Sequence, residues 1–235
     1  MSTGVVVLLF GGFVCLMIVV GVLGLLAERR RRDEFAALGA QHGWGYLQRD
    51  DQWGRSFTGR PFNQGHNRQS RHVLTGEHDG RPFVAFDFIY HTTERSTNSQ
   101  GHTTTREVAH PYSVVALRSD TPLPALAVTP EGFFGRLAGR LTNRDIELES
   151  ENFNRAFTVT CADRKFAFDV LHPRLMEKLL TYRDLSFRFE RHWLLAIHQG
   201  KHTAADLMRR VGALDLVLDE IPDFVWRERR AGETA

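Results

Sequence analysis

The sequence has only two cysteines, Cys15 and Cys161, among its 235 residues. Because one lies in an apolar run and the other far away in a strand-like run, they build neither a disulfide framework nor a multi-cysteine zinc site. Such sparing use of cysteine suits a reducing compartment. A Gly-x-Ser-x-Gly nucleophile elbow is also missing. Since a thiol in a strand is usually buried and inert, neither cysteine indicates nucleophilic catalysis.

Concentrated positive charge is missing from most of the chain. Thirty Lys and Arg residues stand against 28 Asp and Glu residues, a formal net charge of +2, and four of the arginines are consecutive, at 29–32. Without those four, the balance is 26 against 28, a net charge of −2. Nucleic-acid-binding domains present a concentrated basic face, so we expect no nucleic-acid partner.

Charge is absent altogether from residues 4–27. A helix of this length rises about 36 Å, enough to cross a hydrocarbon layer of about 30 Å. A cleavable signal peptide has a basic leader and a small-residue cleavage site, whereas here the leader is Met-Ser-Thr and Ala27 is followed by charged residues. We therefore predict a retained transmembrane helix over 4–27 in the lipid bilayer, after a short external N-terminus of residues 1–3.

The consecutive arginines predict the orientation of this helix. Positive residues close to the membrane are retained on the cytoplasmic side, and nothing on the N-terminal flank opposes Arg29, Arg30, Arg31 and Arg32. The predicted topology has the N-terminus outside and the soluble domain in the cytoplasm. The same arginines are candidate partners for anionic lipid headgroups, each contributing about 1 kcal/mol near the surface. Residues 28–43 are expected to form a basic juxtamembrane helix or linker.

The first half of the expected soluble domain, residues 44–222, is rich in strand signals. A short strand is predicted over 43–48, and a β-hairpin over 71–90, where Asp79 and Gly80 are a turn signal between two strand-like runs.

A polar, threonine-rich segment follows at 91–110. We expect it to be the exposed tip of a long antiparallel hairpin that returns along 112–118. In 123–141, a strand is expected to give way to a short helix after Pro130, because proline is favourable just inside a helix start. The glycines of that helix are separated by bulky residues and do not form a phosphate loop.

The last third of the sequence is the most regular. Thr203, with Asp206 three residues later, is an N-cap signature for an amphipathic helix that Pro222 ends. The other predicted elements are a strand over 156–160, helices over 163–171 and 172–182, and a hairpin of 185–191 with 192–198. These elements predict an α+β domain with a mixed or mainly antiparallel sheet and packed helices. Residues 223–235 are expected to be a C-terminal tail.

Residues 147–205 carry a recognisable pattern. A Glu-Ser-x-x-Phe-x-x-x-Phe-x-Val run is followed by an acidic turn and a Leu-x-Pro-x-x-Met-Glu-x-Leu-Leu run. In this order and spacing, the segment resembles a bacterial membrane-associated family of unknown function. The resemblance implies a fold and a location at the bacterial plasma membrane, and it implies no reaction. The residues that carry it are Glu149, Ser150, Phe153, Phe157, Val159, Asp163, Leu171, Pro173, Met176, Glu177, Leu179 and Leu180.

Eleven histidines invite a search for metal ligands. His198 and His202 have the spacing of a helical metal pair, but Gly200 lies between them and no zincin glutamate follows His198. His91, His102 and His110 flank the polar segment, yet nothing in the sequence holds three ligands in tetrahedral geometry.

Three acidic residues also lie close together in the sequence. Glu147, Glu149 and Glu151 alternate along an expected strand, where a solvated edge is commoner than a pair of tuned acids. No catalytic, cofactor-binding or metal-binding residue is assigned.

Two functional hypotheses remain. In the first, the chain is a single-pass membrane protein whose cytoplasmic domain is a non-catalytic interaction or scaffold module that binds an unidentified protein partner or lipid. In the second, it is a membrane-tethered, metal-dependent enzyme that uses histidines around 91–110. We favour the first, because each catalytic template tested against the sequence fails whereas the membrane segment and the domain are clear.

Overall fold

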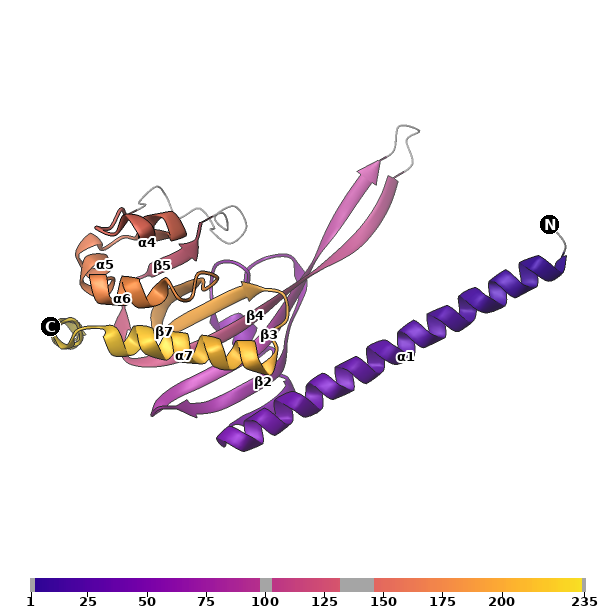
Figure 1. The fold of residues 1–235 in the computed structure, drawn as a ribbon, viewed down its shortest axis with the longest axis horizontal. Helices are drawn as coiled ribbons and strands as arrows, with labels where there is room; N and C mark the ends of the chain where they lie inside the picture. Colours follow the sequence, from indigo (N-terminus) through magenta and orange to yellow (C-terminus); the bar gives the residue numbers. More distant parts are fainter. Residues whose placement is uncertain (1–2, 98–102, 132–145, 234–235) are drawn as a thin grey trace.

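The structure, a computed structural model, describes residues 3–97, 103–131 and 146–233. Its centre is a seven-stranded sheet in the order β1-β2-β3-β4-β7-β5-β6, and all neighbouring strands are antiparallel. Figure 1 shows α7 across one face of the sheet, α4, α5 and α6 grouped near β5, and α1 leaving the domain as a long rod. The predicted α+β class is confirmed.

The elements have the following bounds. The strands are β1 Gly45–Arg49, β2 His66–His78, β3 Arg81–Thr97, β4 Thr103–Leu123, β5 Leu126–Pro130, β6 Phe157–Cys161 and β7 Phe187–Gln199. The helices are α1 Thr3–His42, α2 Gln52–Ser56, α4 Glu151–Ala156, α5 Arg164–Val170, α6 Pro173–Leu179, α7 Ala204–Glu220 and α8 Asp223–Glu233.

Apolar side chains alternate along the central strands and form a core on each face of the sheet, as strand periodicity requires. Phe83, Ala85 and Val115 face the larger core, which α1, α7 and the small helices cover. Phe86 and Phe88 face a smaller core, which is covered by the segment around Phe57 and Phe62, after α2.

Strand β7 corrects one prediction. Residues 185–191 and 192–198 were expected to be two strands of a hairpin, but Phe187–Gln199 is a single strand. Arg191 has a φ of 57°, which breaks the regular ladder without reversing the chain. Before it, β7 pairs with β5, and after it, β7 pairs with β4. The last strand in sequence is thus inserted between two that follow each other in the chain.

The polar segment at 91–110 also differs from its prediction. It is mostly strand, because β3 pairs with β4 without interruption from Phe83 opposite Leu117 to Thr97 opposite Thr103. Only residues between the two strands are left for a tip, and residues 98–102 lie outside the described residues. The pairing of β3 with β4 therefore extends beyond the strand residues that face the cores, into residues that are polar and exposed.

Helix α1 is continuous from the apolar segment into the domain. Among the described residues, one helix is long and apolar enough to cross a membrane, at 11–42, with a mean hydropathy of 2.2 over its best window. The apolar side chains between Phe13 and Leu26 are exposed, whereas Phe35 is 0% exposed and Leu38 is buried. The helix ends at Gly43, which has a φ of 70°. Residues 28–42 are therefore a docked helix rather than a free linker.

Three further predictions meet the structure near the C-terminal half. Residues 223–233 form α8, in which Val225 is buried, where a tail was expected. Glu147 and Glu149 lie outside any strand, and Glu151 begins α4, because the chain turns into a helix capped by Ser150. The helix expected after Pro130 falls on residues 132–145, outside the described residues.

Replacing Phe35 with Ala tests the docking of α1. Removing a fully buried phenylalanine leaves a cavity and costs about 3–5 kcal/mol. We expect urea unfolding of the detergent-solubilised chain, followed by tryptophan fluorescence, to show this loss. Glu34→Ala, at an exposed position on the same turn, is the control and should leave the midpoint nearly unchanged. Equal, small effects of the two substitutions would mean that α1 is not docked on the sheet.

Candidate functional site at the junction of the long helix and the sheet

A row of polar side chains crosses the face of the sheet that carries the larger core. Asp87 of β3 lies opposite Ser113 of β4, and Ser113 lies opposite His198 of β7. His72 of β2 joins the row at a bulge, with a φ of 50°. We call these four residues the polar row. Three of them, His72, Asp87 and Ser113, are buried, so each needs a partner inside the protein.

Helix α1 supplies two of those partners. Glu28, Arg31 and Phe35 are three and four residues apart and so lie on one side of the helix. The Arg31 guanidinium donates from Nε and Nη2 to Oδ2 of Asp87, at 3.2 and 2.8 Å. It also lies 4.8 Å from the centre of the Phe35 ring. Nε2 of His72 lies 2.9 Å from Oε1 of Glu28, so the helix contacts the row at two points.

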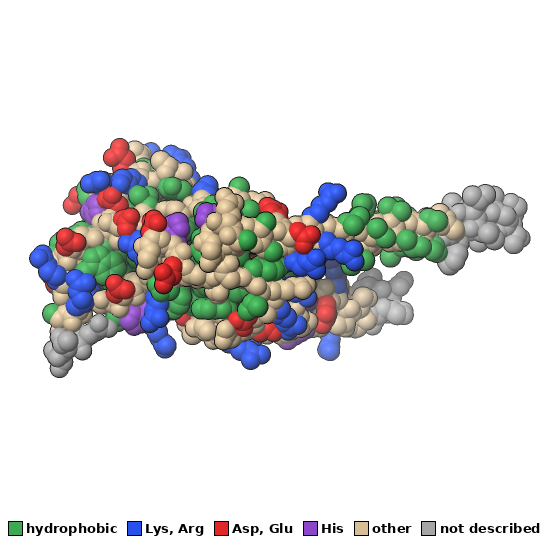
Figure 2. All heavy atoms as spheres, turned by 90° about the horizontal axis from the view of Figure 1, so that it is seen from below, with side chains coloured by type: hydrophobic (Ala, Val, Ile, Leu, Met, Phe, Trp, Pro, Cys, Tyr) green, Lys and Arg blue, Asp and Glu red, His purple; other side chains and the backbone are tan. Residues whose placement is uncertain are grey.

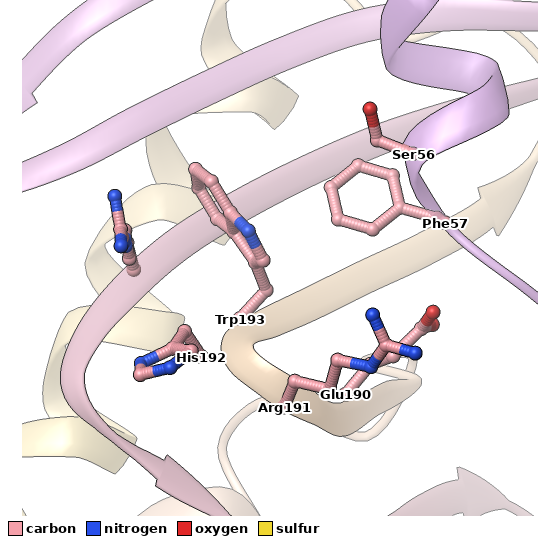
Figure 3. Close-up of a pocket in the computed structure, with 7 residues that line it drawn as sticks. Ser56, Phe57, Glu190, Arg191, His192 and Trp193 are labelled. Carbon is pink, nitrogen blue, oxygen red and sulfur yellow. The ribbon is translucent and has the colours of Figure 1, made fainter.

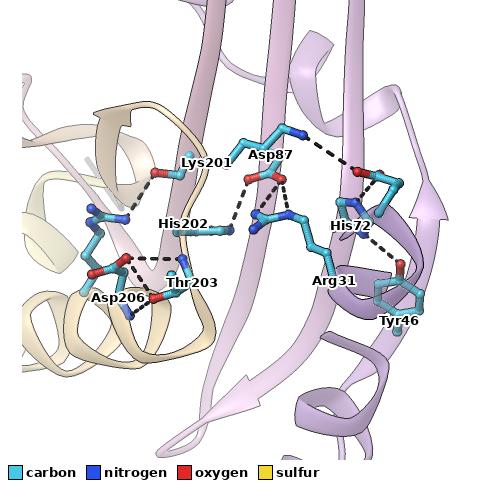
Figure 4. Close-up of polar contacts among 11 residues, drawn as sticks. Arg31, Tyr46, His72, Asp87, Lys201, His202, Thr203 and Asp206 are labelled. Carbon is cyan, nitrogen blue, oxygen red and sulfur yellow. Dashed lines mark hydrogen bonds and ion pairs between the residues drawn. The ribbon is translucent and has the colours of Figure 1, made fainter. Parts of the chain in front are cut away.

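His72 is held from the other side as well. Its Nδ1 lies 2.9 Å from the hydroxyl oxygen of Tyr46, in β1. The ring is therefore bonded at both nitrogens, between α1 and β1, and it is 2% exposed. Figure 4 shows Tyr46 in contact with the His72 ring. The other ring nitrogen of His72 contacts the Glu28 carboxylate.

The Arg31–Asp87 ion pair is largely shielded from water. The side chain of Arg31 is 17% exposed and that of Asp87 is 1% exposed. Burial raises the pKa of Asp87, and the nearby Arg31 charge opposes that rise. Removing one member of a buried ion pair leaves the other charge without compensation, which is the costly case. The pair therefore holds α1 to the middle of the sheet.

His202 lies on the other side of Asp87. Its Nε2 is 3.6 Å from Oδ1 of Asp87, which is longer than a hydrogen bond. Among the described residues, neither ring nitrogen of His202 nor Oδ1 of Asp87 has a hydrogen-bond partner. The His202 ring stacks on Phe35 at 5.5 Å. Burial, reinforced by the charges of Arg210 and Arg31, lowers the pKa of His202 to about 3, so the imidazole is neutral at physiological pH.

Helix α7 closes the row at its far end. Nη1 of Arg210 donates to Oγ of Ser113 at 3.2 Å. Burial lowers the pKa of His198, and the positive charge of Arg210 adds to this effect. The start of α7 is fixed by the predicted capping pair, in which Thr203 accepts from the Asp206 amide and Asp206 accepts from Thr203. The row thus links α1, the sheet and α7, because His72 and Asp87 bond to side chains of α1 and Ser113 bonds to Arg210 of α7.

The structure does not bring the candidate histidines of the polar segment together. His91 lies opposite Ala109 and His110 lies opposite Tyr90, so the two histidines point to opposite faces of the ribbon. His110 stacks on Tyr90 at 4.7 Å and contacts the Thr92 hydroxyl at 2.8 Å. His102 lies outside the described residues. His198, by contrast, belongs to the polar row, and His202, on the other side of the turn at Gly200, lies next to it.

Two other polar groups are weaker candidates. His78, Asp79 and Asp215 offer possible ligand atoms within 4.8 Å of one another, but Arg81 already pairs with Asp215 and Asp79 is exposed. Cys161 is buried, and burial raises the pKa of its thiol, in keeping with the inert role expected for it.

A hollow of about 220 Å³ lies at the bend of β7, on the opposite face from the polar row. Figure 3 shows Trp193, His192 and Arg191 of β7 among the side chains that line it, with Phe57 on the other side. Glu190 is already bonded to the amide and the hydroxyl of Thr58, at 2.7 and 2.8 Å. The hollow is smaller than the roughly 300–1,000 Å³ of typical ligand sites, so we place the candidate site at the polar row.

Sequence reasoning missed Asp87, His72 and the inward role of Arg31. A signal for the first was present, because Asp87 is the one acidic residue inside the otherwise apolar run Phe83–Ile89. A carboxylate in a strand that apolar neighbours predict to be buried needs a cation or donors nearby. The residues near Asp87 in the sequence do not identify the cation that pairs with it, because Arg31 is 56 residues away.

A family of proteins of unknown function is similar to the second half of this chain. Residues 114–211 match the model of a family described as protein of unknown function (DUF3137). This match includes the whole segment whose pattern resembles an uncharacterised family, and it confirms that resemblance. The pattern is explained by folding: Ser150 caps α4, Asp163 caps α5, and Phe153 and Phe157 are buried. No curated protein matches the sequence.

One solved structure is similar in fold. It is the crystal structure of the mycobacterial trehalose monomycolate transport factor A, TtfA, with 14% sequence identity and a TM-score of 0.56. The similarity covers 82% of this chain and 95% of that chain. At this identity, the likeness shows a common fold.

The Arg31–Asp87 pair generates a stability prediction. Asp87→Ala leaves the Arg31 charge half-buried and unpaired, so we expect a loss of about 3–5 kcal/mol in urea unfolding of the solubilised chain. The double variant Arg31→Met, Asp87→Leu removes both charges and should recover most of that loss. Asp33→Ala, which breaks the exposed Arg32–Asp33 pair, is the control and should cost about 0–1 kcal/mol. A similarly small effect of Asp87→Ala would argue against a buried pair.

His202 generates a pH prediction. Its pKa is about 3 in the folded protein against 6.5 for the free side chain, so the unfolded chain binds a proton that the folded chain refuses. The contribution of neutral His202 to the free energy of unfolding is therefore fully present above pH 6.5. It is lost as the pH falls towards 3, and it amounts to a few kcal/mol in total. The raised pKa of Asp87 acts in the opposite direction, so the His202 contribution must be isolated by substitution.

We expect His202→Phe to reduce the loss of stability between pH 7 and pH 5, measured by urea unfolding at each pH. Phenylalanine keeps the stacking on Phe35 and cannot take up a proton. His66→Phe, at an exposed position, is the matched control and should keep the wild-type pH dependence. An unchanged slope in His202→Phe would show that this histidine does not resist protonation.

Proposed function

We propose that this chain is a single-pass bacterial plasma-membrane protein and that its domain is a non-catalytic interaction module on the cytoplasmic side. Residues 4–27 of α1 would cross the bilayer. The observation that carries the proposal is the continuity of α1, which runs from exposed apolar residues to buried Phe35 with no break. A helix whose C-terminal part packs on the core of the domain, through Phe35 and Leu38, fixes how that domain faces the membrane.

The polar row is what makes the attachment rigid. Arg31 follows Ala27 by four residues, which is about 6 Å of helix, and it is bonded to Asp87 in the centre of the sheet. The sheet would therefore lie directly beneath the membrane, without a flexible linker. A scaffold that presents a surface at a fixed height and angle needs such a connection, whereas an enzyme acting on soluble substrates does not.

The arginines divide into two roles under this proposal. Arg31 serves the domain, through Asp87. Arg29 and Arg30 are exposed at the end of the apolar segment, and Figure 2 shows basic side chains gathered there, next to the apolar part of α1. These positions suit contact with anionic lipid headgroups and retention of this flank in the cytoplasm. Arg32 bonds its neighbour Asp33.

The similar solved structure is that of a transport factor, at an identity that shows the fold alone. The proposal of an interaction module therefore rests on the docked helix α1 and not on the role of that protein. The enzyme hypothesis finds no support in the arrangement of its residues, because His91 and His110 point to opposite faces.

A protease-protection experiment tests the proposed topology. A tag placed after Ala235 should survive protease added outside intact cells and should be lost once the inner membrane is permeabilised, while a tag before Met1 should be digested in intact cells. Extraction with alkaline carbonate should leave the protein in the membrane fraction. Digestion of the C-terminal tag in intact cells would overturn the cytoplasmic assignment, and release by carbonate would overturn the anchor.

A further inference from the structure

Among the described residues, no element covers the outer part of the β3–β4 hairpin. We call residues 92–97 of β3 and 103–110 of β4 the arm. Strand β2 stops pairing with β3 at His91, and β7 reaches β4 no further than Pro111, through the Gly200 amide. Within the described residues, every side chain of the arm is exposed or half-buried. Both edges of the ribbon therefore display backbone donors and acceptors that other strands normally occupy.

The arm points towards the membrane end of the molecule. In Figure 1 the arm and the apolar part of α1 leave the domain towards the same end, and the perpendicular view in Figure 2 agrees. The lengths of the arm and of the lower part of α1 can be compared by taking the contact between Arg31 and Asp87 as a common starting point. The apolar segment ends four residues before Arg31, or about 6 Å along the helix. Thr97 lies ten residues beyond Asp87, or about 33 Å along the strand.

The arm therefore reaches the level of the bilayer. Even if its axis were inclined by about 45° to α1, ten residues of strand would advance roughly 23 Å along the helix axis. This exceeds the distance from Asp87 to the end of the apolar segment by far. The reach follows from one continuous strand, since β3 holds Asp87 in its middle and forms the arm with its end.

The chemistry of the arm excludes lipid as its surroundings. Apart from Val108 and Ala109, its side chains are polar, and Glu94 faces Arg106 across the ribbon. Two acidic and two basic residues balance each other, so there is no positive excess to bind anionic headgroups. An unpaired backbone group in hydrocarbon costs several kcal/mol, and irregular or open-edged backbone at membrane depth is tolerated only against protein or a water-filled cavity.

We infer that the arm is a docking element for an integral membrane protein that presents a polar, water-accessible surface at the level of the inner half of the bilayer. The inference rests on the proposed anchoring by α1. The open edges of the arm suit the addition of an extended segment of that partner as a further strand, in which backbone hydrogen bonds provide the affinity. The polar row supports this contact from behind, because it holds the arm at a fixed distance from the helix.

Cysteine accessibility tests the inference. In a chain carrying Cys15→Ala and Cys161→Ala, we would introduce Thr97→Cys on one strand of the arm and, separately, Thr104→Cys on the other. Asp79→Cys, at the turn before β3 and thus at the opposite end of the same strand, is the matched control. A membrane-impermeant maleimide is applied to inside-out native membrane vesicles and to nanodiscs of pure lipid that hold a single copy of the chain.

The two arm cysteines should react at least about tenfold more slowly in native vesicles than in nanodiscs, because the rate follows the fraction of molecules whose arm is uncovered. Asp79→Cys should react rapidly in both. A photo-crosslinker at position 97 should join the chain to an integral membrane protein. Fast labelling of the arm in both preparations would place it in water and overturn the inference. Slow labelling in both would assign the cover to lipid or to the chain itself, and a disulfide between two copies through Thr97→Cys would assign it to a second copy; either result also overturns it.

Failure of the anchoring proposal gives a different signature. If Asp79→Cys reacts only in right-side-out vesicles, the cytoplasmic topology is wrong, and the arm is then compared with Asp79→Cys from that side. If carbonate releases the protein, the anchor is wrong. Neither result resembles rapid labelling of the arm in a chain that remains anchored.

Discussion

The buried ion pair between Arg31 and Asp87 is the contact on which the arrangement of this protein depends. Desolvating two charges is expensive, and a buried pair is a weak source of net stability. Its value lies in specificity, because it accepts one rotation and one height of α1 relative to the sheet. Phe35 supports it from the next turn of the helix, in contact with the rings of His72 and His202. An apolar contact alone would let the helix slide or rotate at small cost.

Strand β3 carries this geometry to the rest of the molecule. Its middle holds Asp87 in the polar row, and its end forms the arm with β4. A continuous antiparallel pair is stiff along its length, so a helix fixed at Asp87 also fixes the direction of the arm. The row extends through Ser113 to Arg210, so α7 shares the same reference point. Helix α1, the sheet and the arm are thus connected through Asp87.

The sequence predicted local elements well and long-range arrangement poorly. The helix cap at Thr203, the end of α1 at Gly43 and the turn at Asp79 depend on residues within a few positions, and the structure contains all three. The hairpin predicted at 185–198 was wrong, because the alternation on each side of Arg191 is the same whether the chain reverses or continues. For the candidate site, Asp87 was missed although it is a charge in an apolar strand, and no residue near it in the sequence identifies Arg31 as its partner.

The sequence by itself determined three features of this protein: the length of the apolar segment, the α+β class and the positions of most helices. Each of these depends on composition or on the spacing of residues over a few turns. Tertiary structure alone decided which of four consecutive arginines turns inward. It also decided that His91 and His110 face apart, because strand register sets side-chain direction residue by residue. The four arginines look alike in the sequence, and only the position of Arg31 on the face of α1 that meets Asp87 distinguishes it from its neighbours.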